Sequence, residues 1–171
     1  MDFKVSGPVA VDVSAMGFHV KGPMILCGID PGREKMGVAL AEDGALLFSA
    51  ILSLNQLPLL CAALGDGRWD AFVPTERREG FSEGKPEITF LGNGTASAFA
   101  AEELKKNGVD YCLIDESGTT LEARTLYWQL HPPQGLWSFF PLSLRVPPRP
   151  LDDLAAWAIL KRGEIKLTLP E

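Results

Sequence analysis

Residues 24–41 read MILCGIDPGREKMGVALA, and this stretch decides the fold. Its first part is a short apolar run that reaches Asp30 and then meets a Pro-Gly pair at residues 31–32. An apolar run of this length that stops at a turn is typical of a buried strand. The sequence therefore predicts a strand over residues 24–30, with Asp30 at its carboxyl end.

Two further strands are expected directly after it. Apolar runs cover residues 36–41 and 45–52, and Glu-Asp-Gly at residues 42–44 separates them. An Asp-Gly pair between two apolar runs is a strong signal for a tight hairpin turn. Three successive strands joined by tight turns predict an antiparallel meander.

Downstream of the meander, helical and strand periodicity alternate. Helices are expected over residues 54–64, 96–106, 120–130 and 151–161, with Thr120 as a cap and Gly163 as a stop. Strands are expected over residues 87–91 and 110–115, with a third short strand allowed over residues 69–74 and a surface loop over residues 76–86. This order predicts an α/β fold, with helices flanking a mixed five-stranded sheet in which parallel strands join the three-strand antiparallel meander. It is also the element order of ribonuclease-H-like domains.

The length of 171 residues suits one domain, which we place at residues 23–171. Residues 1–22 form an N-terminal extension, in which the alternation over residues 9–13 is compatible with an added strand. The composition, 46% hydrophobic and 22% charged, is that of an ordinary globular protein. No apolar stretch is long enough for a membrane helix, so we expect no membrane partner.

Charge and cysteine content bound the function further. The net charge is −6 and the isoelectric point is near 5.0, which excludes a protein that coats DNA through overall positive charge. Nucleic acid can bind only through a local basic patch. The three cysteines, Cys27, Cys61 and Cys112, lack metal-type spacing, so we expect buried free thiols and a cytoplasmic location.

Acidic residues occur where side chains leave the core. Asp30 ends the first strand, Glu116 follows a later strand, and Asp152 and Asp153 open the last helix. Carboxylates at strand ends and helix starts can converge on one site, and converging carboxylates repel unless a cation holds them. All-oxygen ligation of this kind suits Mg²⁺ or Mn²⁺.

Each of these acids also has a purely structural explanation. An Asp before Pro-Gly often forms the turn, Asp115-Glu116 can be a solvated turn, and acids in the first turn of a helix complement its dipole. Between the two aspartates, the helical wheel favours Asp152 as the ligand, because it borders the apolar face while Asp153 points further away.

Three segments resemble motifs of one family. Residues 28–39, GIDPGREKMGVA, resemble the opening motif of YqgF-like and RuvC-like Holliday junction resolvases. Residues 115–123, DESGTTLEA, and residues 152–160, DDLAAWAIL, resemble the later motifs of that family in the same order. The resemblance implies a ribonuclease-H-like fold, with Asp30, Glu116 and Asp152 as the catalytic and metal-binding acids.

The chain departs from this pattern in one place. RuvC-type proteins offer two acids three positions apart on the last helix, whereas positions 149 and 155 here are Arg149 and Ala155. The fourth acid is therefore missing unless Asp153 replaces it.

A glycine-rich segment is a second difference from the resolvase pattern. Residues 92–97, GNGTAS, resemble a segment in the YqgF-like domain of the transcription accessory protein Tex. A turn of this kind that leads into a helix can hold a phosphate on its backbone N–H groups, which makes Gly92, Asn93, Gly94 and Thr95 candidates for nucleic-acid binding. The alternative is that the glycines only make a tight turn and Thr95 caps the helix.

Positive side chains near the acids are candidates to hold phosphates. Arg33 and Lys35 follow Asp30, and the last helix is flanked by Arg145, Arg149, Lys161 and Arg162. The alternative is solvated charge scattered over the surface.

The sequence therefore predicts a Mg²⁺- or Mn²⁺-dependent, structure-selective endonuclease that cleaves branched DNA or structured RNA. The resemblance implies a role in DNA recombination and repair. Resolvases that cut two strands symmetrically usually act as dimers, which makes a homodimer a further expectation. The alternative function is a catalytically inactive nucleic-acid-binding module that kept the fold.

Overall fold

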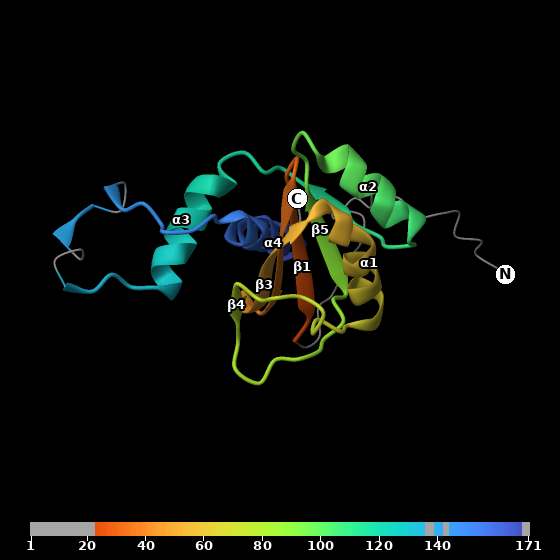
Figure 1. Ribbon diagram of the computed structural model, residues 1–171, viewed down its shortest axis with the longest axis horizontal. Coiled ribbons are helices and arrows are strands. Elements are labelled where there is room, and N and C mark those ends of the chain that lie inside the picture. Colours follow the sequence, from red (N-terminus) through yellow and green to blue (C-terminus); the bar gives the residue numbers. More distant parts are fainter. Residues whose placement is uncertain (1–22, 136–138, 142–143, 169–171) are drawn as a thin grey trace.

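The stretch that decides the fold forms β1 (Ile25–Pro31), an inner strand of a six-stranded mixed sheet (Figure 1). The computed structural model describes residues 23–135, 139–141 and 144–168. Its strands follow the order β4-β3-β2-β1-β5-β6 across the sheet. The expected N-terminal extension, with its added strand, lies outside the described residues.

The meander forms as expected. β2 (Lys35–Glu42) pairs with β1 and with β3 (Ala45–Ser53), antiparallel in both cases. The turn between β2 and β3 places Asp43 at φ 49° and Gly44 at φ 74°. Two successive residues in the left-handed region are what a tight hairpin turn requires, and Asp-Gly adopts this conformation readily.

Two parallel strands extend the sheet on the other side of β1. β5 (Ile88–Gly92) pairs with β1 and β6 (Cys112–Ile114) pairs with β5, both in parallel register. The carboxyl ends of these three strands therefore meet at one edge of the sheet. The predicted α/β fold, with a mixed sheet flanked by helices, is confirmed.

The helices cover both faces of the sheet (Figure 1). One core packs under α1 (Leu57–Asp66), which a short 3₁₀ turn at Leu54–Gln56 precedes, and under α2 (Ser97–Lys106). The other core packs under α3 (Thr119–Leu130) and α4 (Asp152–Thr168). Between α3 and α4 the chain loops away from the sheet.

Two strand predictions were wrong. The expected strand over residues 69–74 does not form. Trp69 is instead fully buried, its ring centroid lies 5.6 Å from that of Phe48, and its indole N–H donates to the Gly84 carbonyl oxygen at 2.9 Å. The expected surface loop instead contributes β4 (Glu76–Arg77), which pairs with β3 and makes a sixth strand.

The last helix runs beyond its predicted end at Gly163. This glycine lies over the Phe90 ring of β5, so closely that a β-carbon there would overlap the ring atoms. Gly163 therefore serves close packing rather than helix termination, and α4 continues to Thr168.

Cys27, Cys61 and Cys112 are buried free thiols, which confirms their expected state. Within the part of the chain that the structure describes, no helix combines the length and apolarity needed to span a bilayer.

We expect the contact between β1 and α4 to be intolerant of added volume. A β-carbon at Gly28 would overlap the Ala156 carbonyl oxygen and lie 2.9 Å from the Leu160 β-carbon. Gly28→Ala should therefore lower the free energy of unfolding by about 3 kcal/mol or more. The measurement is urea denaturation followed by circular dichroism.

Gly65→Ala is the matched control. Nothing lies within 4 Å of a β-carbon at Gly65, which is a helical residue of α1. This substitution should raise stability by about 0.5–1 kcal/mol, since alanine favours the helix. Equal effects of the two substitutions would contradict the close packing of α4.

Candidate metal centre

Asp30 lies at the carboxyl end of β1, on the face that α4 covers. Its side chain shares this face with Gly28, two residues earlier, which lies under Ala156. Across the sheet, Asp30 pairs with Gly37 of β2, and a β-carbon at Gly37 would overlap the backbone oxygen of Asp152. The absence of a side chain at Gly37 thus lets the start of α4 approach Asp30 closely.

Glu116 approaches the same edge from the other side, two residues beyond β6. Its carboxylate lies against Gly92 and Gly94, where a β-carbon at Gly94 would overlap Oε1 and one at Gly92 would lie 2.6 Å from Oε2. Its backbone N–H donates to Asn93 Oδ1 at 3.2 Å. The glycine-rich turn therefore accommodates the Glu116 side chain at the end of β5.

The turn that carries Glu116 leads directly into α3. The helix begins at Thr119 after Gly118 at φ 81°, so the expected cap at Thr120 is wrong. Thr119 instead donates from Oγ1 and from its backbone N–H to the Glu116 carbonyl oxygen, at 2.9 and 3.0 Å. These bonds fix the backbone at Glu116 to the first turn of the helix.

The three acids act on one another electrostatically. Burial raises the pKa of Asp30 most, and the negative charges of Glu116 and Asp152 add to it, so that the pKa lies at about 7 although Lys35 lowers it. A carboxyl group with its pKa raised by burial and by two neighbouring carboxylates is typical of a functional site. The three acids that the sequence singles out therefore lie within electrostatic reach of one another.

A cation would suit this arrangement. Glu116 Oε2 is buried without a hydrogen-bond partner among the described residues, and a buried carboxylate oxygen left unpaired is costly. The donor set is all oxygen, as Mg²⁺ or Mn²⁺ prefers. As the side chains stand, however, no three His, Cys, Asp or Glu groups within the described ranges are close enough to share an ion.

Lys35 contributes the nearest positive charge. Its Nζ lies 2.8 Å from Asp152 Oδ2, and the side chains of Lys35 and Asp152 are 42% and 24% exposed. Asp152 therefore has an ion-pair partner, whereas Glu116 Oε2 has none among the described residues.

Asp153 lies elsewhere, and the helical wheel misplaced it. Its side chain is fully buried, with Oδ2 accepting from Ser49 Oγ at 2.7 Å and Oδ1 from Arg149 Nη1 at 2.7 Å. It points into the interface between α4 and β3 instead of away from the core. Both carboxylate oxygens are already used by protein partners.

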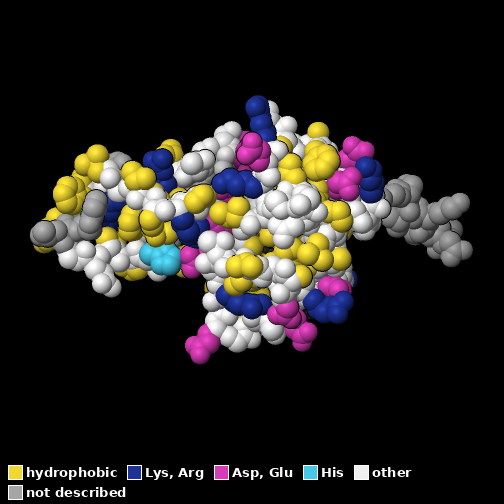
Figure 2. Space-filling model, in the orientation of Figure 1, with side chains coloured by type: hydrophobic (Ala, Val, Ile, Leu, Met, Phe, Trp, Pro, Cys, Tyr) yellow, Lys and Arg dark blue, Asp and Glu magenta, His cyan; other side chains and the backbone are white. Residues whose placement is uncertain are grey.

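The arginines predicted to contact phosphates differ in their surroundings. Arg33 is exposed in the turn between β1 and β2, close in sequence to Asp30 and Lys35. Arg149 is engaged with Asp153 and, through Nη2, with Glu76 Oε1 at 2.8 Å. Arg145 lies 6.0 Å from the Trp128 ring, in the segment between α3 and α4. Figure 2 shows Lys and Arg side chains scattered among Asp and Glu on the visible face.

The glycine-rich turn has a different environment from the one expected. Gly92 and Gly94 face the Glu116 carboxylate, which would repel a phosphate placed at the same position. The Asn93 N–H donates to the Ile114 carbonyl oxygen at 3.0 Å, and Ala96 rather than Thr95 is the N-cap of α2. The expected cap at Thr95 is wrong, and Gly92 is the last residue of β5 rather than part of a turn.

Arg162 of α4 has a structural role that its sequence position does not reveal. Its guanidinium donates to the carbonyl oxygens of Asp115 and Ser117, at 2.6 and 2.8 Å, and forms an ion pair with Glu122. These carbonyls flank Glu116, so Arg162 holds the turn that presents the carboxylate. The contacts span 40 to 47 residues of sequence, a separation that local patterns cannot detect.

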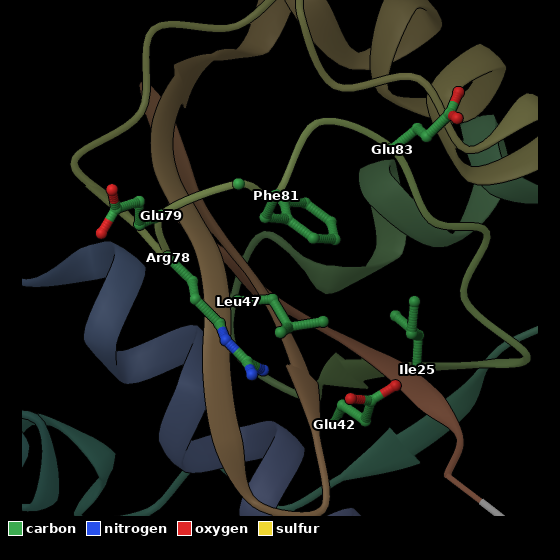
Figure 3. Close-up of a pocket in the computed structure, with 8 residues that line it drawn as sticks. Ile25, Glu42, Leu47, Arg78, Glu79, Phe81 and Glu83 are labelled. Atoms are coloured by element: carbon green, nitrogen blue, oxygen red, sulfur yellow. The ribbon is translucent and has the colours of Figure 1, made fainter.

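A hollow of about 360 Å³ lies at the opposite end of the sheet (Figure 3). It is lined by Ile25 at the start of β1 and by Glu42, Leu47, Arg78, Glu79, Gly80, Phe81 and Glu83. Because Ile25 and Asp30 lie near opposite ends of β1, this hollow is separate from the three acids.

The raised pKa of Asp30 predicts a dependence of stability on pH. Its folded-state pKa of about 7 exceeds the ordinary value of 3.8, so the folded state keeps a proton that the unfolded state releases. The resulting stability is complete below about pH 4 and is lost as the pH rises through 7. Asp30→Asn cannot titrate, so its stability relative to wild type should rise by about 2 kcal/mol between pH 5 and pH 8.

The measurement is chemical denaturation of both proteins at pH 5 and pH 8. A constant difference in stability between wild type and Asp30→Asn at the two pH values would contradict the raised pKa.

Arg162→Met should lower the free energy of unfolding by about 2 kcal/mol, because the Asp115 and Ser117 carbonyl oxygens and Glu122 lose their shared donor. Arg124→Met, at an exposed position of α3, is the matched control and should change stability little. Thermal unfolding of the two variants checks this, and equal melting temperatures would show that Arg162 does not hold the turn.

Comparison with known proteins gives a likeness at the level of structure. No protein-family model matches the chain, and no curated protein matches it. The Thermus thermophilus RuvC structure matches with a TM-score of 0.46 and 15% identity, over 85% of this chain and 95% of that chain. T. thermophilus RuvC in complex with a Holliday junction substrate matches with a TM-score of 0.45 and 14% identity, over 85% and 94% of the two chains.

Proposed function

We propose that this chain is a divalent-metal-dependent nuclease that cleaves phosphodiester bonds in structured nucleic acid. The observation that carries the proposal is the convergence of Asp30, Glu116 and Asp152 from separate segments at one sheet edge. The resemblance of the three sequence motifs to those of Holliday junction resolvases supports the same site.

Asp30, Glu116 and Asp152 would hold the ion, which is Mg²⁺ or Mn²⁺. When bound, such an ion lowers the pKa of water and offsets the negative charge that develops on a phosphate under attack. The proposed ligand set leaves out Asp153, because Ser49 and Arg149 occupy both of its oxygens. Ion binding would require the three carboxylates to draw together, which the repulsion between them opposes until the ion is present.

The protein's own residues would prepare the site in two ways. Gly92 and Gly94 leave room for the Glu116 carboxylate, and Arg162 fixes the backbone on both sides of it. α4 excludes water from the buried side of Asp30, which keeps that carboxyl poised to exchange its proton for a cation near neutral pH.

Nucleic acid would approach from the turn between β1 and β2. Arg33 is exposed there, and Lys35 follows it at the edge of the acids. With a net charge of −6, binding must rest on such local contacts and on the shape of the substrate. Branched DNA and structured RNA are therefore the substrates to screen, and symmetric cleavage of a junction would require a homodimer.

A second candidate function is a nucleic-acid-binding module without catalysis. It is favoured by the arrangement of the described acids, of which no three are close enough to share an ion, and by the ion pair between Lys35 and Asp152. Such a module would bind nucleic acid in a salt-dependent manner and would leave it intact.

The test is cleavage of labelled four-way DNA junctions and structured RNA in the presence of Mn²⁺. Wild type should cleave at least one of these substrates, and Asp30→Asn should lower the rate by at least about a hundredfold. Asp110→Asn, an exposed acid before β6, is the matched control and should cleave as wild type does.

Equal cleavage by wild type and Asp30→Asn would overturn the site assignment. Salt-sensitive binding by wild type, with intact substrate at every Mn²⁺ concentration, would instead establish the second candidate function.

A further inference from the structure

Residues 131–150, which we call the arm, lie between α3 and α4 and project away from the sheet (Figure 1). Both ends of the arm are held at one carboxylate oxygen of β4. His131 Nε2 lies 2.7 Å from Glu76 Oε1, and Arg149 Nη2 donates to the same oxygen at 2.8 Å. The ends of the arm are therefore closed onto the domain, as in surface loops that carry a function.

The arm exposes large apolar side chains. Phe139, Leu144 and Val146 are 83%, 64% and 76% exposed, and Phe140 is 48% exposed. Figure 2 shows hydrophobic side chains gathered at the left of the view, where the arm projects. Single exposed apolar residues are ordinary on a protein surface, whereas several on one projecting segment indicate an interaction site.

The basic residues of the arm are turned toward the domain. Arg149 forms ion pairs with Glu76 and Asp153 at the base of the arm. Arg145 lies 6.0 Å from the Trp128 ring of α3, and its Nε is buried. The exposed part of the arm is therefore apolar rather than basic, which favours a protein surface over a phosphate backbone as its partner.

The hollow at the amino end of β1 offers a surface that suits the arm (Figure 3). Its volume of about 360 Å³ falls in the range of pockets that enclose a ligand. Its lining contains three apolar residues, three glutamates and one arginine, namely Ile25, Leu47, Phe81, Glu42, Glu79, Glu83 and Arg78. Residues 131–150 contain no Asp or Glu, so an arm can enter among these glutamates without repulsion between carboxylates.

The arm and the hollow of one chain lie on opposite faces of the sheet. The apolar lining of the hollow belongs to the core under α1 and α2. The arm instead ends at Glu76, which pairs with Ser49 of β3, and at Asp153 of α4 on the other face. While its ends stay at Glu76, the arm thus points away from its own hollow, and a second copy of the chain supplies another.

We propose that the arm docks in the hollow of a second copy of this chain, and that the contact occurs twice in a two-fold dimer. Phe139 and its apolar neighbours on the arm cover the apolar lining of the hollow. Each chain gives its own arm and receives that of the other copy, so both contacts close within the dimer. The inference does not depend on the metal centre.

The test is sedimentation velocity of the full chain from about 1 μM to about 1 mM, which measures the dissociation constant of the dimer. Wild type should dimerise within this range. Phe139→Glu removes an exposed ring and places an acid among the glutamates, so the constant should rise at least about tenfold. Adding Glu79→Lys and Glu83→Lys to the same chain should recover at least about fivefold, because opposite charges then meet.

Phe99→Glu is the matched control. Its ring is 50% exposed on α2, away from the arm, so the dissociation constant should stay within about twofold of wild type. Thermal unfolding of each variant establishes that it folds. Should Phe139→Glu fail to fold, Leu144→Glu carries the same test.

A wild-type chain that stays monomeric over the whole range would overturn the proposal. Equal dissociation constants of wild type and Phe139→Glu would overturn it as well. A loss that the two added lysines do not recover would show that the arm contacts a surface other than the hollow, which also contradicts the proposal. The metal centre is tested separately by Asp30→Asn.

Discussion

The close approach of α4 to the sheet is the constraint on which the rest of the structure depends. It is permitted by glycines at three points, where Gly37 lies under Asp152, Gly28 under Ala156, and Gly163 over Phe90. A side chain at any of these positions would push the helix outward. Because the backbone oxygen of Asp152 lies directly over Gly37, the same contact that closes the core brings the start of α4 to Asp30.

This packing has an electrostatic cost that the fold offsets only in part. Asp30 becomes partly buried near two other carboxylates, and its pKa rises to about 7. Lys35 neutralises Asp152, but Glu116 Oε2 has no hydrogen-bond partner within the described part of the chain. By contrast, the ion pair of Asp153 with Arg149 is completed by Ser49 and Glu76. Asp153 thus joins β3 to α4 with both carboxylate oxygens paired, whereas Asp30, Glu116 and Asp152 are only partly buried.

The sequence predicts most of the fold because its strongest signals are local. The apolar run before Asp30 and the Asp-Gly turn at residues 43–44 fix the meander without reference to distant residues. The failures involve contacts between distant segments. Trp69 packs beside Phe48 in the core and donates to the Gly84 carbonyl oxygen, and Gly163 packs against the Phe90 ring. A local sequence pattern does not reveal either contact.

The candidate site was likewise predictable where its signals are local. Asp30, Glu116 and Asp152 could be selected by their places at strand ends and at a helix start, and by the three motifs. The helical wheel could not show that Asp153 is buried and paired, because its partners are the side chains of Ser49 on β3 and of Arg149. The role of Arg162 likewise depends on a contact with a turn that lies far away in sequence.

The most direct test of the central claim, that these three acids form one divalent-metal site, is Mn²⁺-induced broadening of backbone amide resonances in nuclear magnetic resonance spectra. We expect the amides of Asp30, Glu116 and Asp152 to broaden first, at substoichiometric Mn²⁺. Those of Ile25 and Glu42, which line the hollow at the opposite end of the sheet, should keep their intensity. Broadening centred on that hollow, or uniform weak broadening across the protein, would contradict the account.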